Sequence, residues 1–296
     1  MGDLSYEGIE PGREYGPYEY PLKARIERHL EAIENGHPWH RERSPWGPPV
    51  APPTLMANAS LRFMDWIAPV PPGTLHAKQE AEFVSALRRD RRLIGYGKFV
   101  EKYEKRGRQW FVFEARWRDE TGLILARTLT VMAFPTAATQ APEQGTGNKE
   151  QGKDELPRKG ELTPVRRALT LARLTAYSED SANALRGQSI HTDAAVAAAK
   201  GFPAAVAQGM MSAEYISEAM TGALGQGWLI GGRLSLAFVR PALCGDTLTA
   251  NGRLAEEIDE GSYVRRVYEV WCENQRAEAV TVGTASGLLL ASATGK

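Results

Sequence analysis

Apolar residues along the second half of the chain follow two different periods. Between residues 206 and 224 they recur three or four positions apart, at Val206, Met210, Ala213, Ile216, Met220 and Leu224. This spacing is typical of a helix with one buried face. The segments that follow, 233–239, 247–258, 263–272 and 278–290, are separated by turn signals and predict strands. The second half therefore predicts a helix followed by an antiparallel sheet.

The first half repeats this order of elements, with strands predicted at 75–84, 93–104, 109–117 and 123–134. Identical residues recur 155 positions apart, at the pairs Phe83 and Phe238, Val84 and Val239, Leu93 and Leu248, and Gly97 and Gly252. Self-similarity at a fixed offset indicates an internal duplication. A sheet that wraps around its helix buries the apolar faces of both, which is the hotdog arrangement. We expect an α+β protein built as a tandem, or double, hotdog.

The stretch 136–162 separates the two halves and is rich in Gly, Pro, Gln and charged residues. Such a composition is typical of a linker. We therefore expect one hotdog at 1–135 and a second at 163–296. A chain of 296 residues with 43% hydrophobic residues is sufficient for a core in each half.

Charge and cysteine content narrow the classes of partner. The 36 basic and 36 acidic residues balance, so neither nucleic acid nor an anionic membrane is an expected partner. The first residues lack the pattern of a secretory signal, and no segment is long and apolar enough to span a membrane. We expect a cytoplasmic protein in which Cys244 and Cys272 pack as small apolar residues without a disulfide.

Three strings in the second half resemble one known family. SIHTD, GFPAAVAQGMMS and FVRPALCGDTL occur in that order and are similar to strings of the MaoC-like hydratases and dehydratases. The first half resembles the degenerate hotdog of the double-hotdog members of that family. The resemblance implies reversible hydration of a 2-enoyl thioester, or the reverse dehydration, usually with the acyl group on coenzyme A. It implies no cofactor beyond the coenzyme A of the substrate. No metal site is expected, because no third ligand type lies near His37 and His40 and a proline stands between them.

This chemistry requires an acid/base group and a donor for the charge that develops on the thioester oxygen. His191 occupies the family's histidine position, and the ordinary pKa of histidine suits proton transfer near neutral pH. Gly209 resembles the family's oxyanion residue at the start of the central helix, where backbone N–H groups lack acceptors. A structural histidine and a small residue at a helix entry are the simpler alternatives.

The chain departs from the family pattern at the catalytic carboxylate. Arg186 and Gln188 stand where the family has aspartate and asparagine. The loop is about three residues longer than usual, so we expect Asp180 to supply the carboxylate, unless Asp180 and Glu179 simply face water. Arg186 suits a second acid group on the acyl chain, or is a surface residue.

Other residues are expected to contact the substrate or to mark a lost site. With Arg186 and Gln188, we expect Gln208, which replaces the usual histidine, and Met210 to bind substrate. In the first half Pro53 stands where Gly209 stands in the second, and proline has no N–H to donate. Asn35 replaces the aspartate there, although His40 keeps the histidine position. We therefore expect one active site per chain.

Two further observations leave alternatives open. The arginine-rich run 88–92 suits coenzyme A phosphates, but is also ordinary for a turn. Hotdog folds also host thioesterases, and loss of the usual aspartate fits a pocket that binds without hydrating, or a dehydratase or isomerase variant on a substrate without coenzyme A. A homodimer of the fused chain is possible.

Overall fold

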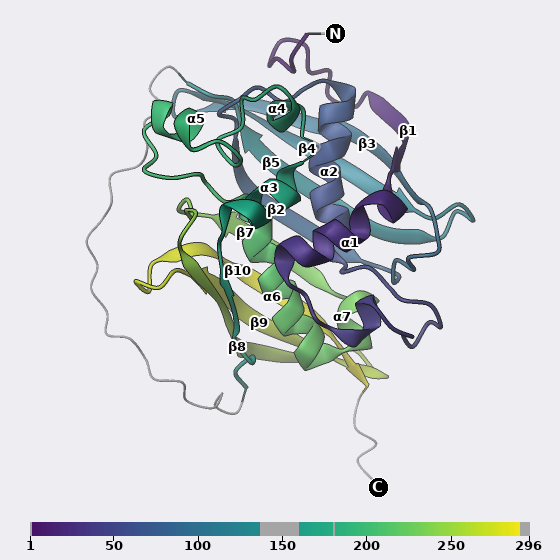
Figure 1. The fold of residues 1–296 in the computed structure, drawn as a ribbon. Coiled ribbons are helices and arrows are strands. Elements are labelled where there is room, and N and C mark those ends of the chain that lie inside the picture. Colours follow the sequence, from purple (N-terminus) through teal and green to yellow (C-terminus); the bar gives the residue numbers. More distant parts are fainter. Residues whose placement is uncertain (1, 137–159, 180, 291–296) are drawn as a thin grey trace, which may run out of the picture.

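The computed structural model describes residues 2–136, 160–179 and 181–290, which are called the described residues below. Its ten strands form one antiparallel sheet in the order β1-β3-β4-β5-β2-β7-β10-β9-β8-β6 (Figure 1). The strands are β1 (Glu14–Tyr20), β2 (Leu75–Phe83), β3 (Leu93–Lys105), β4 (Arg108–Arg118), β5 (Ile124–Ala133), β6 (Val165–Ala168), β7 (Arg233–Phe238), β8 (Thr247–Asp259), β9 (Tyr263–Glu273) and β10 (Ala279–Leu290). The sheet confirms the fold class expected from the sequence.

Each half contributes five neighbouring strands, and the halves meet where β2 pairs with β7. In this pairing Lys78 lies opposite Ala237 and Glu82 opposite Arg233. The strand order on either side of this pair is the same, because β5, β4, β3 and β1 correspond in position to β10, β9, β8 and β6. The duplicated sequence therefore forms a pseudo-twofold sheet.

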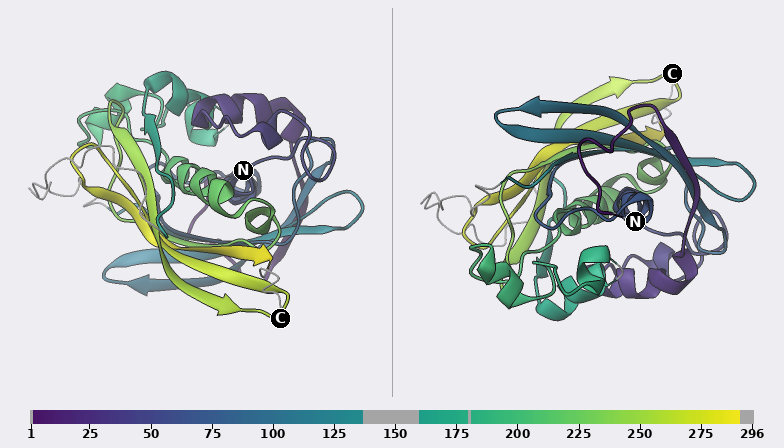
Figure 2. Two further views of the ribbon diagram at one scale, coloured as in Figure 1. Left: turned by 90° about the horizontal axis from the view of Figure 1, so that it is seen from below. Right: turned by 90° about the horizontal axis from the view of Figure 1, so that it is seen from above.

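Two long central helices lie against the sheet, and shorter helices cover them on the far side (Figure 2). The central helices are α2 (Thr54–Ile67) and α6 (Gly209–Leu224), and the others are α1 (Leu22–Ile33), η1 (Pro38–His40), α3 (Leu171–Ser178), α4 (Ala182–Leu185), α5 (Ala194–Ala199) and α7 (Gln226–Leu229). α1 packs against α3 across the pseudo-twofold axis. No helix in the described part is long and apolar enough to cross a bilayer.

The expected apolar face of the second central helix is buried. Met210, Ala213, Ile216, Met220 and Leu224 are all at most 5% exposed. Burying such side chains contributes about 1.5–3 kcal/mol each relative to leaving them in water. The helix begins at Gly209, three residues later than the periodic pattern, and ends where Gly225 adopts a positive φ of 52°.

Val206, the first residue of the periodic pattern, lies in an extended segment before α6. It forms an isolated bridge with Leu243, and Val50 forms the equivalent bridge with Arg88 in the first half. Both valines precede the start of a central helix by a few residues. The duplication thus extends to the loops that lead into α2 and α6.

The last two residues of the predicted linker, 161 and 162, pair with a strand of the second half. Residues 137–159 lie outside the described residues, but Glu161 bridges to Arg253 and the Leu162 N–H donates to the Gly252 carbonyl oxygen at 2.8 Å. Leu162 is also buried. Residues 161 and 162 therefore belong to the second half, since both pair with β8.

The two cysteines are free, as expected. Cys272 is buried in β9 and Cys244 is half-buried in the loop after β7. Burial raises the pKa of the Cys272 thiol well above its ordinary value. Cys272 therefore packs as an apolar residue.

Candidate active site

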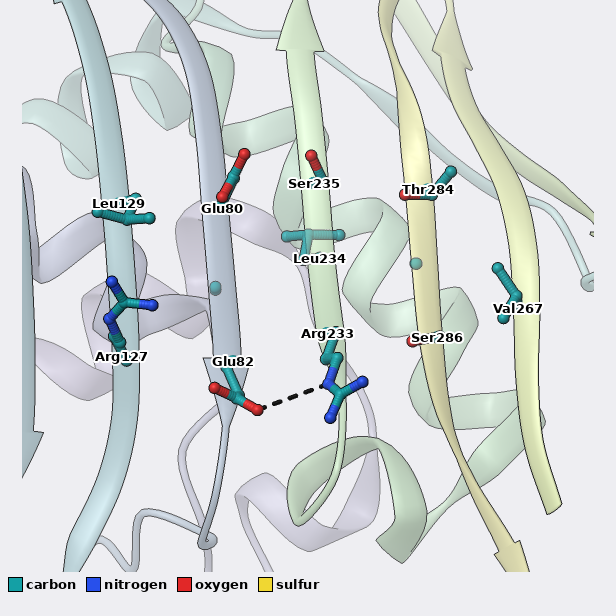
Figure 3. A pocket seen from close by; sticks show the side chains of 12 residues that line it. Glu80, Glu82, Arg127, Leu129, Arg233, Leu234, Ser235, Val267, Thr284 and Ser286 are labelled. Carbon is teal, nitrogen blue, oxygen red and sulfur yellow. Dashed lines mark ion pairs between the residues drawn. The ribbon is translucent and has the colours of Figure 1, made fainter. Parts of the chain in front are cut away.

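A cavity of about 1340 Å³ opens between the two halves. Its walls come from the outward face of α2, the loop 188–191, the start of α6 and the end of β7. A smaller hollow of about 370 Å³ lies on the outer face of the sheet over β5, β2, β7, β10 and β9, where Glu82 pairs with Arg233 (Figure 3). Only the larger cavity contains residues expected to be functional from the sequence.

His191 lines the larger cavity, and its ring orientation is fixed by the backbone. Nδ1 lies 2.6 Å from the Val206 carbonyl oxygen, and the His191 N–H donates to Ser189 Oγ at 3.2 Å. Because a carbonyl only accepts, Nδ1 carries the proton and Nε2 keeps a lone pair. Burial lowers the pKa of His191, and the positive charge of Arg62 lowers it further. The neutral imidazole is therefore suited to accept a proton at Nε2.

Gly209 lines the same cavity as the first residue of α6. Its N-cap, Gln208, makes no side-chain capping hydrogen bond, and the first turn contains no acidic residue. The amino end of α6 thus offers backbone N–H groups and a positive dipole end to an anion. A Cβ on Gly209 would come 2.8 Å from the ring of Phe238, so packing also requires glycine at this position.

Three of the four residues expected to bind substrate line the cavity: Gln188, Gln208 and Met210. The Gln208 amide nitrogen donates to the Leu174 carbonyl oxygen at 3.3 Å, while its oxygen is buried without a partner. Arg186 does not line the cavity. Its guanidinium pairs with Asp3 at 2.7 Å on the surface, so it does not occupy the place beside the acyl pocket that the family pattern suggested.

The carboxylate expected at Asp180 lies outside the described residues. Glu179 does not line the cavity and pairs with Arg28 at the surface. Among the described residues that line the cavity, Asp65 alone has a carboxylate. Its oxygens accept hydrogen bonds from the backbone N–H groups of Val70 at 3.0 Å and Ala182 at 3.2 Å. Asp65 therefore holds the loop after α2 and the start of α4 in place.

Two aspartates in the family-like strings have structural roles. Asp193 of SIHTD caps α5 by accepting from the N–H groups of Ala195 and Val196. Asp246 of FVRPALCGDTL is buried and accepts from the Leu243 N–H at 2.8 Å. That loop in turn anchors the entry to α6, because the Ala207 N–H donates to the Ala242 carbonyl oxygen. These two aspartates therefore help to shape the segments around the cavity.

Sequence reasoning did not single out three cavity residues of the first half. Asn58 and Arg62 lie one turn apart on α2, and His76 lies on β2 with its ring 4.7 Å from that of Phe238. Burial lowers the pKa of His76 to about 4, so this imidazole is neutral. The spacing of Asn58, Arg62 and Asp65 on one helical face was the available signal, and it lay in the half expected to lack a site.

The first half keeps a copy of the histidine, but that copy is enclosed. His40 Nδ1 lies 2.9 Å from the Val50 carbonyl oxygen, as His191 does with Val206. His40 is 0% exposed, its Nε2 has no partner, and burial lowers its pKa to about 4. Pro53, which provides no N–H, stands immediately before α2. These contacts offer neither an accessible base nor an oxyanion donor.

A buried polar cluster lies beside the entry to α2. Glu214, which is 156 positions after Asn58 and 1% exposed, accepts a hydrogen bond from Thr54 Oγ1. His29 Nε2 lies 3.2 Å from the Glu214 carboxylate, and the Tyr177 hydroxyl donates to it at 3.5 Å. Asn58 faces the open cavity, whereas Glu214, its counterpart on α6, is enclosed.

The arginine-rich run 88–92 lies away from the cavity. Arg88, Arg89, Arg91 and Arg92 pair with Asp90, Glu27, Glu120 and Glu19, respectively. None of the four lines the cavity. No group of three or more His, Cys, Asp or Glu side chains in the described part of the chain could hold a metal ion.

Comparison with known proteins gives matches at the level of structure alone. No protein-family model and no curated protein matches the sequence. A solved MaoC-like dehydratase is 16% identical with a TM-score of 0.72, covering 97% of this chain and 100% of that one. A protein described as a MaoC domain dehydratase, from Chloroflexus aurantiacus J-10-fl, is 8% identical with a TM-score of 0.71, covering 97% of each chain.

A conserved hypothetical protein of Mycobacterium tuberculosis, described as having a double hotdog fold, is also similar. It is 11% identical with a TM-score of 0.63 and covers 98% of each chain. At these identities the matches show the fold. The chain has the double hotdog fold seen in MaoC-like dehydratases, over nearly its whole length.

Proposed function

We propose that this double hotdog protein adds water to a 2-enoyl thioester, or removes it from the 3-hydroxyacyl thioester. The observation that carries the proposal is the orientation of His191, whose Nδ1 is held by the Val206 carbonyl oxygen in the cavity that also contains the amino end of α6. A base with a free lone pair and a set of backbone donors are the two elements that this reaction requires. The solved dehydratases of the same fold support the reaction class.

In the hydration direction, His191 Nε2 removes a proton from water as the water oxygen bonds to the β-carbon. The electrons of the double bond move onto the thioester oxygen, where the N–H of Gly209 at the positive end of α6 stabilises the developing charge. The imidazolium then returns its proton to the α-carbon. Each step balances, and His191 ends in its original neutral state.

Asp180 remains our proposed second proton carrier. Ser178 and Ser181, the described cavity residues on either side of it in the sequence, support this assignment. Glu179 is less suitable because it forms an ion pair with Arg28. Asp65 is less suitable because its carboxylate oxygens already accept hydrogen bonds from backbone N–H groups. The carboxylate would orient the attacking water and share its proton with His191.

We further propose that the acyl carrier is coenzyme A. Arg108, Lys200 and Arg240 line the cavity from three separate segments. Lys200 is exposed and the two arginines are half-buried, which is the placement expected for groups that meet phosphates at a cavity mouth. This arrangement replaces the arginine-rich run 88–92 as the candidate phosphate contact.

The test is the loss of the enoyl-thioester absorbance band with a panel of 2-enoyl-CoAs. We expect the wild-type protein to bleach the band, His191→Ala to reduce kcat by about 100-fold or more, and Asp180→Asn to reduce it strongly. Glu179→Gln is the matched control for Asp180→Asn, because it removes the neighbouring carboxylate, and its rate should stay at the wild-type level. An unchanged band in the wild type would overturn the proposal.

The same assay separates the alternatives. Thiol detection would register free coenzyme A if the protein were a thioesterase. Tight binding with no spectral change and no thiol would indicate a protein that holds the thioester without hydrating it. For hydration, we expect neither result.

A further inference from the structure

Arg62 is a cation of the cavity wall whose charge acts on His191. It lies on the central helix α2, and its charge reaches His191 strongly enough to lower the pKa of that imidazole. The cations at Arg108, Lys200 and Arg240 come instead from β4, from the residue after α5 and from the segment after β7. Arg62 therefore stands apart from the groups proposed to meet phosphates.

The hydrogen-bonding capacity of Arg62 is largely unused. One terminal nitrogen donates to the Tyr177 carbonyl oxygen at 3.1 Å, and Nε is buried without any partner. No described carboxylate forms an ion pair with it, since Asp65 on the next turn of α2 is held by backbone N–H groups. Burial lowers the pKa of the guanidinium and the positive charge of Arg25 lowers it further, while the charge of Asp65 partly opposes both.

Three other arginines whose side chains are at most 19% exposed form ion pairs. Arg173 pairs with Glu34, Arg265 with Glu260, and Arg167 with Glu218. Removing a guanidinium from water is unfavourable unless an anion or several acceptors replace the water. An arginine in the cavity wall that no described carboxylate pairs with is suited to an anion that a ligand brings.

We propose that Arg62 binds a carboxylate on the acyl chain, and that the preferred substrates are thioesters of unsaturated dicarboxylic acids. This inference rests on the proposed hydratase function. The planar guanidinium forms charge-assisted hydrogen bonds with a carboxylate, and its second terminal nitrogen forms no hydrogen bond with the described residues. The carboxylate-binding role that the sequence suggested for Arg186 is thus assigned to a residue of the other half.

The test compares matched substrates that differ only at the chain end. The neutral members are 2-butenoyl-, 2-pentenoyl- and 2-hexenoyl-CoA, and each has a counterpart in which a carboxyl group replaces the terminal methyl. For at least one pair, we expect wild-type kcat/KM to favour the carboxylated member by about 10- to 100-fold, the factor typical of a hydrogen bond to a charged group. A preference for every neutral member would overturn the inference.

Three variants assign the preference to Arg62. Arg62→Gln should abolish it, mainly by raising KM for the carboxylated substrate, whereas Arg62→Lys should retain part of it. Arg186→Gln is the matched control, because it removes a guanidinium outside the cavity, and it should keep the full preference. An Arg62→Gln variant that folds, as judged by its circular dichroism, and still prefers the carboxylated substrates would overturn the inference.

Binding of saturated thioesters separates this inference from the proposed reaction. Calorimetry measures the affinity for hexanoyl-CoA and hexanedioyl-CoA without turnover. We expect the protein to bind hexanedioyl-CoA more tightly, and this difference should depend on Arg62. If no enoyl thioester is hydrated but this preference depends on Arg62, the proposed role of Arg62 is supported and the proposed hydratase activity is wrong. If enoyl thioesters are hydrated without regard to the terminal carboxyl group, the reaction stands and the inference fails.

Discussion

His191 Nδ1 is tied to a backbone carbonyl, so protonation of the neutral ring takes place at Nε2. A base whose pKa lies below the ordinary 6.5 stays neutral into mildly acidic solution. We predict that the acid limb of kcat/KM for a neutral enoyl thioester lies below pH 6.5. Rate measurements from pH 5 to 8 would check this, and a limb above 6.5 would contradict the assignment.

Arg62 should influence that limb through its charge. Its positive charge lowers the pKa of His191, so Arg62→Gln should raise this pKa and move the acid limb to higher pH. Arg62→Lys keeps the charge and should leave the limb near its wild-type position. Titration of the His191 ring by NMR gives the same comparison without turnover. No difference between the two variants would show that the charge does not reach the ring.

Residue identity in the site was partly predictable. The family-like strings pointed to His191, in the loop 188–191, and to Gly209, the first residue of α6. The sequence did not predict that Arg62 and His76 belong to the site. The cavity lies between the halves, and a single sequence does not show which face of α2 lines it. For Arg186 the sequence left a surface position open as an alternative, and the guanidinium pairs with Asp3 at the surface.

The amino end of α6 allows a test with two glycines of one helix. A Cβ at Gly209 would lie 2.8 Å from Phe238, whereas one at Gly222 would meet nothing within 4 Å. We predict that Gly209→Ala lowers kcat strongly by displacing the first turn. Gly222→Ala should instead stabilise the protein by up to about 1 kcal/mol, through the helix propensity of alanine, with unchanged activity. Thermal unfolding and initial rates check both, and similar behaviour of the two variants would contradict the role of the first turn.

Hydrophobic periodicity predicted the helices and strands in which the pattern extends over many residues. The four predicted strands of each half and the second central helix are present, since their faces alternate or repeat against one core. The edge strands β1 and β6 were not predicted. β6 has only four residues, and β1 has a register shift between Tyr15 and Tyr18, so neither carries a clear alternating pattern.

The Glu214 cluster connects α6 to α1, α2 and α3, and its loss should affect stability rather than catalysis. We predict that Glu214→Ala lowers the free energy of unfolding by about 1–3 kcal/mol, because His29 and Thr54 lose their buried partner. Glu218→Ala, one turn further on, should lower it less, because this residue is only partly buried. Urea unfolding measures both, and an equal effect would contradict the special role of the cluster.

At the scale of the whole molecule, two buried imidazoles make the free energy of unfolding depend on pH in acidic solution. His40 and His76 have pKa values of about 4 in the folded protein, against about 6.5 when unfolded. The unfolded chain therefore binds more protons between these values, and stability falls as pH drops from 6.5 to 4. Each histidine contributes up to about 3 kcal/mol to this loss.

His40→Asn tests this contribution. The amide keeps a donor near the Val50 carbonyl oxygen but does not titrate. The variant should show a shallower fall of unfolding free energy between pH 6.5 and 4 than the wild type. An identical pH dependence in chemical unfolding would exclude His40 as its source.

The covalent join between the halves has a genetic consequence. In an assembly of two identical subunits, any substitution appears at both symmetry-related positions, so a change that improves one pocket is imposed on its twin. Here Asn58 and Glu214 are encoded separately, and one faces the open cavity while the other is enclosed. The fused chain can therefore change one of these positions without changing the other, and in this protein the two positions already differ in residue and in burial.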